Sequence, residues 1–136
     1  MPSGYSGRPL AAKLGLKQGQ KAWAGGMPAS VAAEIEGDLP GFRFAAEPEA
    51  GLDVAHLFTA SRPELEAALA RLRPLLAPAG MIWVSWPKKA SKVPTDITED
   101  VVREVAFPHG LVDVKVCAVD ETWSGLKLVI RKALRG

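Results

Sequence analysis

Apolar residues gather in a few short runs along the chain, and segments with helical spacing separate these runs. The runs at 81–86 and 52–59 are nearly continuous, which is typical of parallel strands that are buried on both faces. Pro87 has no N–H to give to a sheet ladder, so we expect the central strand to end there. At 112–118 and 126–131, apolar and polar residues alternate instead. This alternation predicts two final strands, and the short link between them predicts an antiparallel hairpin.

Shorter elements are expected in the first third of the chain. The sequence predicts short strands at 21–25 and at 42–44. Proline suits the first turn of a helix and glycine its end, which predicts one helix at about 9–14 and another from Pro28 to Gly37.

The helix after the 52–59 strand has the clearest start signal. Ser61 and Glu64 form a capping box, in which the Ser61 hydroxyl accepts from the Glu64 N–H while the Glu64 side chain reaches back. Leucines at 65, 69, 72 and 76 then repeat at helical spacing. Pro74 interrupts this helix, so we expect a kink or a separate last turn there. A further helix is expected to start at Thr98.

Strands that alternate with helices predict a three-layer α/β domain with a mostly parallel sheet, which ends in the antiparallel hairpin. The 136 residues are expected to form one domain, 1–136. Residues 1–8 are rich in Gly and Ser, and we expect them to form a flexible arm. This arm and the exposed strand edges are compatible with a homodimer.

Composition narrows the class of protein. The chain is 48% hydrophobic and 24% charged, with a net charge of only +2, which disfavours nucleic acid as the main partner. Its one cysteine, Cys117, rules out an internal disulfide, and no Cys/His cluster has zinc spacing, so we expect no metal. Neither a membrane span nor the apolar core of a signal peptide is present. We therefore expect a cytoplasmic protein with no membrane partner.

The loop behind the central strand is the main candidate site. It carries Lys88, Lys89 and Lys92 and leads to the helix that starts at Thr98. Open α/β folds place ligands at the carboxyl ends of their strands. Three ammonium groups beside the N–H groups of a helix start can hold a phosphate or carboxylate of an anionic small molecule.

The alternative is a solvated loop, which is the commoner state of surface lysines. On this interpretation, three nearby carboxylates neutralise the lysines: Asp96, Glu99 and Asp100.

Aromatic and polar residues near the same sheet end are further candidates. Trp86 and Trp123 can stack on a planar ligand, although aromatic residues more often belong to the core. Ser124 shares the loop of Trp123 with Asp120, where hydrogen-bonding groups either orient a polar ligand or form a turn. His56 lies inside a buried strand without a nucleophile motif, so we expect a core histidine with its hydrogen bonds made.

The chain also resembles two known families. The segment LRPLLAPAGMIWVSW at 72–86 resembles the helix-turn-strand stretch of Rossmann-like S-adenosylmethionine (SAM)-dependent methyltransferases, and the predicted architecture is similar to a shortened methyltransferase fold. The motifs GYSGRPLAAKLGL, WPKKAS, TEDVVREV and KVCAVDETWSGLKLV resemble the domain of unknown function 3052 family of small bacterial proteins. That family is uncharacterised and implies no substrate, cofactor or catalytic residue.

The chain departs from the methyltransferase pattern after its first strand. Those enzymes resemble one another in an acidic residue and a Gly-x-Gly-x-Gly turn, whereas this chain has AWAGGMP at 22–28. The resemblance makes Gly25 and Gly26 cofactor-binding candidates. It also implies that Glu47, near the end of the 42–44 strand, stands where those enzymes hold a ribose. The cofactor itself is left unknown.

Together these patterns favour a non-catalytic binding or regulatory module with a methyltransferase-like scaffold, whose basic loop takes an anionic ligand. The alternative is a SAM-dependent group-transfer enzyme that acts in the same crevice. A second alternative is a nucleic-acid-binding module, which the low net charge disfavours.

Overall fold

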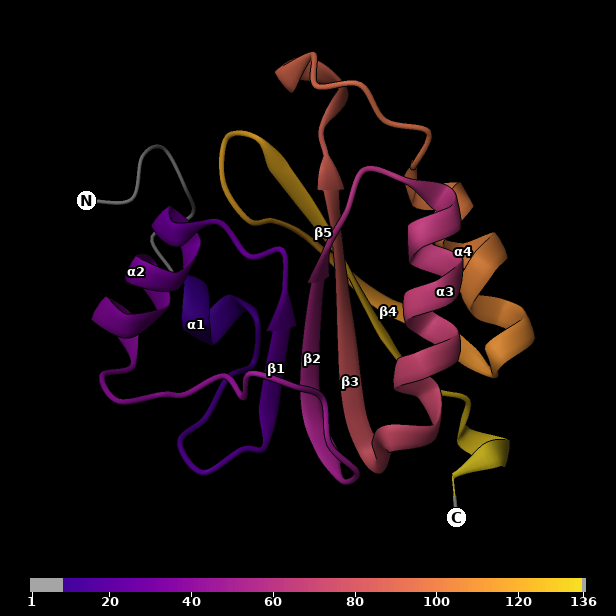
Figure 1. The fold of residues 1–136 in the computed structure, drawn as a ribbon, viewed down its shortest axis with the longest axis horizontal. Helices are drawn as coiled ribbons and strands as arrows, with labels where there is room; N and C mark the ends of the chain where they lie inside the picture. The colour runs from indigo at the N-terminus through magenta and orange to yellow at the C-terminus, as the bar shows by residue number, and fades with distance from the viewer. Residues whose placement is uncertain (1–8, 136) are drawn as a thin grey trace.

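A mixed five-stranded sheet runs through the middle of the computed structural model, which describes residues 9–135 (Figure 1). The strand order is β1-β2-β3-β5-β4, with β1, β2 and β3 parallel and the β3–β5 and β5–β4 pairs antiparallel. This confirms the parallel core and the C-terminal hairpin, while the predicted arm lies outside the described residues. The strands are β1 (Ala22–Gly25), β2 (Leu52–Phe58), β3 (Leu76–Pro87), β4 (Leu111–Ala118) and β5 (Trp123–Ile130).

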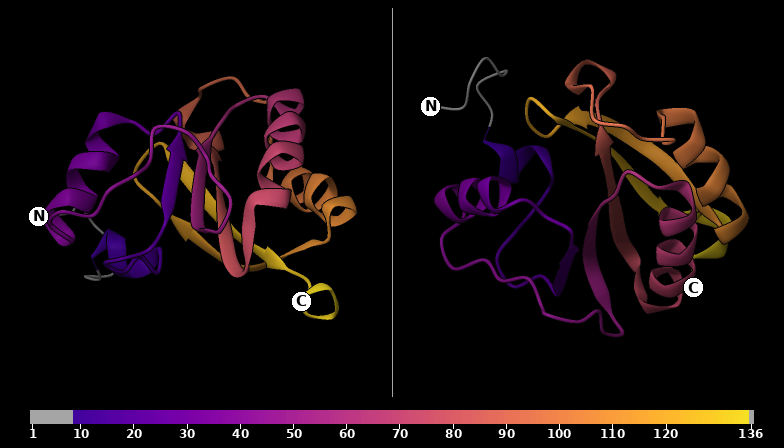
Figure 2. Two further views of the ribbon diagram at one scale, coloured as in Figure 1. Left: turned by 60° about the horizontal axis from the view of Figure 1, so that its bottom comes forward. Right: turned by 45° about the horizontal axis from the view of Figure 1, so that its top comes forward.

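Helices cover both faces of the sheet, as the α/β prediction requires (Figures 1 and 2). On one face, α1 and α2 pack with Val54, Phe58 and Trp83, and on the other α3 and α4 pack with the intervening residues of the same strands. Trp83 is fully buried, and its Nε1 donates to the Leu14 carbonyl at 2.9 Å, which ties α1 to the central strand. The helices are α1 (Leu10–Lys13), α2 (Ala29–Asp38), α3 (Arg62–Leu72) and α4 (Glu99–Ala106).

Helix α3 begins and ends as its sequence predicts. The Ser61 hydroxyl accepts from the Glu64 N–H at 3.4 Å, and a separate 3-10 turn at Arg73–Leu75 follows α3, as Pro74 requires. The capping box is incomplete, however, because the Glu64 carboxylate accepts from the Thr59 hydroxyl instead of reaching back.

The strand predicted at 42–44 is wrong. This segment is a loop, and next to it only a single bridge joins Ala45 to Trp23 of β1. The Phe42 and Phe44 rings pack edge to face with centroids 5.2 Å apart, and both belong to the core on the α1 and α2 face. Their alternation therefore reflects core packing of a loop, because no continuous strand pairing is available to it.

The central strand begins earlier than predicted, at Leu76. Gly80 lies inside it and allows the close approach to β2, since a Cβ there would lie 2.6 Å from the Leu52 carbonyl oxygen. Trp123, expected in a loop, is the first residue of β5, and α2 extends to Asp38 through Gly37.

Candidate functional site

A cavity of about 640 Å³ lies at the carboxyl end of β3, bounded by the 88–98 loop. It brings together six of the seven ligand-binding residues predicted from the sequence: Trp86, Lys88, Lys89, Lys92, Thr98 and Ser124. Apolar residues also line it, namely Pro87, Val93, Pro94 and Ile97, and the lining is completed by Thr95 and Glu99. The cavity therefore combines a cationic rim with an apolar interior.

The sheet fixes one side of this cavity. Trp86 is 7% exposed and stands opposite Ser124 in the β3–β5 register. One residue past the strand, the Lys88 N–H still donates to the Thr122 carbonyl at 2.7 Å. The position of the first lysine therefore follows from the hairpin pairing.

The loop holds its own shape through short-range hydrogen bonds. The Ser91 hydroxyl donates to the Lys88 carbonyl at 2.7 Å and accepts from the Val93 N–H at 3.2 Å. Lys92 between them has a φ of 62°, the only positive value at a non-glycine residue within 9–135. Side chains with a Cβ adopt this conformation at a cost, so the surrounding loop contacts must hold it.

The far side of the loop is anchored to β2 and α4. The Thr95 hydroxyl donates to the Ala60 carbonyl at 2.7 Å and accepts from the Ile97 N–H at 3.0 Å. Thr98 caps α4, as predicted, by accepting from the Val101 N–H at 3.2 Å. These contacts place the N-terminus of α4 at the cavity.

None of the three carboxylates that could neutralise the lysines in the solvated-loop alternative forms an ion pair with them. Asp96 accepts from the Arg62 N–H at 2.7 Å, and both Glu99 and Asp100 form ion pairs with Arg103. The Arg103 guanidinium also bonds Asp113, and these carboxylates raise its pKa, with Asp113 as the largest cause and Glu99 next. Within residues 9–135, no carboxylate forms an ion pair with an ammonium group of the loop.

The structure does not bring Trp123 into this cavity. Its ring packs edge-on against Phe58, with centroids 5.2 Å apart, on the α1 and α2 face of the sheet. Asp120 accepts from the N–H groups of Thr122 and Trp123 at 2.8 and 2.7 Å, which makes it a turn residue. A ligand sandwiched by the two tryptophans is therefore excluded.

The cofactor candidates do not form one site either. Gly26 follows β1 with a φ of 69°, and a Cβ there would lie 2.7 Å from the Phe58 carbonyl oxygen. Glu47 pairs with Arg71, at the end of α3 that lies by the amino edge of the parallel strands (Figure 1). The place implied for Glu47, at the end of a strand at 42–44, is not formed, because that segment is a loop.

These positions test whether the chain fits SAM. The Gly25–Gly26 turn can offer backbone N–H groups to a carboxylate, since it precedes the N-terminus of α2. The ring of Trp23 already lies over Gly25, where a Cβ would meet it at 2.5 Å, and the carboxylate expected for a ribose is at the other edge. The residues implied by the methyltransferase resemblance therefore do not fit the cofactor as a set.

His56 on β2 and Ser85 on β3 form a buried polar pair, of which the sequence predicted only the histidine. His56 and Ser85 are 2% and 0% exposed, and the His56 Nε2 lies 2.7 Å from the Ser85 Oγ. Burial lowers the pKa of His56 to about 3, so the ring is neutral at pH 7. This confirms a core histidine with a hydrogen-bond partner. The sequence offered no signal for Ser85, which is hidden inside an apolar run.

The part of the chain that the structure describes has neither a metal-binding cluster nor a membrane-spanning helix. No group of three His, Cys, Asp or Glu side chains there could hold a metal ion. None of its helices has both the length and the apolar character needed to cross a membrane.

Solved structures with a similar fold include SAM-dependent methyltransferases and complexes with SAM. A TehB-like SAM-dependent methyltransferase from Corynebacterium glutamicum aligns with 94% of this chain and 90% of its own, at 13% identity and a TM-score of 0.54. Magnesium protoporphyrin IX methyltransferase from Synechocystis PCC 6803, with bound SAM, aligns with 89% of this chain and 74% of its own, at 12% identity and a TM-score of 0.55. LepI in its complex with SAM has a TM-score of 0.56 at 12% identity and covers 90% of this chain.

This chain spans only 39% of LepI. No family model and no curated protein matches the sequence. The comparisons therefore confirm the Rossmann-like methyltransferase fold, while membership of the domain of unknown function 3052 family stays a prediction.

Proposed function

We propose that this protein is a group-transfer protein of the SAM-dependent methyltransferase type, and that the lysine cavity binds an anionic group of its substrate. The observation that carries the proposal is the cavity of about 640 Å³, which lies at the carboxyl edge of a methyltransferase-type sheet. Ligands of open α/β sheets bind at this edge. The solved neighbours favour this function over the non-catalytic one.

The chemistry of the cavity indicates the substrate class. Lys88, Lys89 and Lys92 supply positive charge and form no described ion pair, while Glu99, the acid in the lining, pairs with Arg103; this suits a phosphate or carboxylate. Trp86 and Ile97 supply an apolar surface for the rest of the molecule. We therefore expect an amphiphilic substrate, with a planar or apolar body and an anionic group.

A second function, binding of the same anion without group transfer, is favoured by the glycine turn. Glu47 is distant from that turn, and Trp23 covers Gly25. Both features favour a scaffold that has lost its cofactor. We derive no reaction step through SAM, because the residues that should hold it do not assemble.

Thermal unfolding with two separate probes, SAM and pyrophosphate, distinguishes the two functions. A ligand at about a hundred times its Kd adds roughly 2.7 kcal/mol of stability, which raises Tm by several degrees. Stabilisation by millimolar SAM supports group transfer. Stabilisation by pyrophosphate alone supports the second function, and no shift with either probe refutes both.

The lysines themselves are tested by Lys88→Glu combined with Lys89→Glu. We expect this double variant to lose pyrophosphate binding and keep its Tm, because both side chains line the cavity and neither forms a described ion pair. Lys132→Glu reverses an exposed charge outside the cavity and is the control. Unchanged affinity in the double variant would remove the loop from the site.

One prediction from the sequence concerns a homodimer. We propose that a homodimer, if it forms, uses the exposed edge strand β4, where Val114 and Val116 are 54% and 51% exposed. Size-exclusion chromatography with light scattering measures this directly, and a monomer at all concentrations excludes it.

A further inference from the structure

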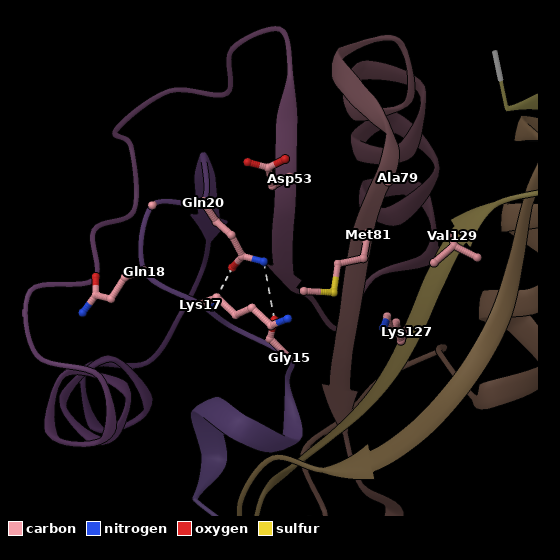
Figure 3. A pocket seen from close by; sticks show the side chains of 10 residues that line it. Gly15, Lys17, Gln18, Gln20, Asp53, Ala79, Met81, Lys127 and Val129 are labelled. Carbon is pink, nitrogen blue, oxygen red and sulfur yellow. Dashed lines mark hydrogen bonds between the residues drawn. The ribbon is translucent and has the colours of Figure 1, made fainter.

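A second cavity, of about 490 Å³, lies on the α1 face of the sheet (Figure 3). The loop at 15–20 forms one wall, and β3 and β5 form the floor with Met81 and Val129. Met81 and Trp86, which line the two cavities, are five residues apart on β3, or about 16 Å at strand spacing. The two cavities are therefore separate.

The wall of this cavity is held in place by its own side chains. The Gln20 Oε1 accepts from the Lys17 N–H at 2.9 Å, and its Nε2 donates to the Gly15 carbonyl at 3.5 Å (Figure 3). The Gln18 Nε2 donates to the Pro40 carbonyl at 2.7 Å. A loop fixed in this way is preorganised, so little conformational entropy is lost when a ligand binds.

Charge in this cavity is unbalanced. Lys127 stands half-buried on β5 beside Val129, and Lys17 stands on the loop above. Within residues 9–135, neither ammonium group forms an ion pair. Asp53 is the one acid in the lining, and its Oδ2 accepts from the Lys21 N–H at 2.8 Å. A ligand that covers the half-buried Lys127 removes its ammonium group further from water, which is unfavourable without a counter-charge, so the cavity favours a ligand that carries an anion.

We propose that this cavity is a binding site for an organic anion that carries one carboxylate, sulfonate or phosphate group on an apolar body. Lys17 and Lys127 bind the anionic group. Met81 and Val129 contact the apolar body, and the volume lies in the range of small-molecule sites. This site lies beyond the proposed function and does not depend on it.

Dansylglycine is a suitable probe, because it joins a carboxylate to a planar apolar ring system and its fluorescence rises on binding. In a fluorescence titration combined with amide NMR, we expect shifts of the 15–20 and 127–129 amides. Shifts confined to the 88–98 loop, or no binding at millimolar probe, would overturn the proposal.

Charge-removing variants test the two lysines. Lys17→Met combined with Lys127→Met should weaken dansylglycine binding about tenfold or more, because two charge-assisted contacts are lost. Lys132→Met is the matched control and should bind as the wild type does. If the double variant does not fold, dansylglycine binding is measured with Lys17→Met alone, which should fold because Lys17 is exposed. Unchanged affinity in a folded variant refutes the site.

Lys88→Glu with Lys89→Glu should leave dansylglycine binding here intact. That variant reverses the charge of two lysines in the other cavity, so the dansylglycine binding that it keeps belongs to the second cavity, and its result separates failure of this inference from failure of the proposed function.

Discussion

Mild acid should destabilise this protein through His56. The ring is 2% exposed and is held neutral in the core, with Ser85 Oγ at 2.7 Å from its Nε2. In the unfolded chain the ring gains a proton with the ordinary pKa of 6.5, whereas burial lowers its pKa in the folded state to about 3. The stabilisation that the neutral ring provides is therefore complete above pH 6.5 and is lost progressively as the pH falls towards 3.

The magnitude follows from this pKa difference. Between pH 7.5 and pH 5 the unfolded state gains almost one proton that the folded state does not, which lowers the free energy of unfolding by about 2 kcal/mol. Most carboxylates titrate below this window, so they contribute little to the change.

Urea unfolding at pH 7.5 and pH 5 measures the effect. The wild type should lose about 2 kcal/mol of stability between these two pH values, and His56→Gln should lose much less, whatever its absolute stability. His109→Gln changes the other histidine and is the control, which should keep the full loss. An equal loss in His56→Gln and the wild type would refute the reasoning.

Two further predictions concern stability and use urea unfolding at neutral pH. Trp83→Phe removes the donor of the 2.9 Å bond to the Leu14 carbonyl and leaves a cavity, so we expect a loss of about 2–4 kcal/mol, and a loss below about 0.5 kcal/mol would contradict this role. Gly26→Ala should cost more than Gly19→Ala: both have positive φ, but only the Gly26 Cβ would meet the Phe58 carbonyl oxygen, at 2.7 Å. Equal losses in the two alanine variants would show that backbone strain alone matters.

Some features of the candidate site were predictable because they depend on neighbours in the sequence. The apolar run before Pro87 predicted a buried strand, and Lys88, Lys89 and Lys92 had to follow its carboxyl end. The cap at Thr98 likewise needs only residues within one turn of α4. These features account for five of the seven predicted ligand-binding residues, whereas Ser124 reaches the cavity through the β3–β5 pairing.

Other features depended on contacts between residues far apart in the chain. The placement of Glu47 beside Arg71 follows from where the 39–51 segment leaves β1, and no local pattern encodes that departure. The second cavity combines Gly15, Asp53 and Lys127, which only the folded sheet brings together.

The sequence by itself determined most of the element types, the α/β class and the basic loop after β3, because periodicity and capping act over one or two turns of chain. The tertiary structure decided the strand order, the start of β3 at Leu76 and the His56–Ser85 pair. It also decided which carboxylates are available to the lysines. These features depend on register and long-range packing, where many small contacts compete, and a single chain segment does not carry that information.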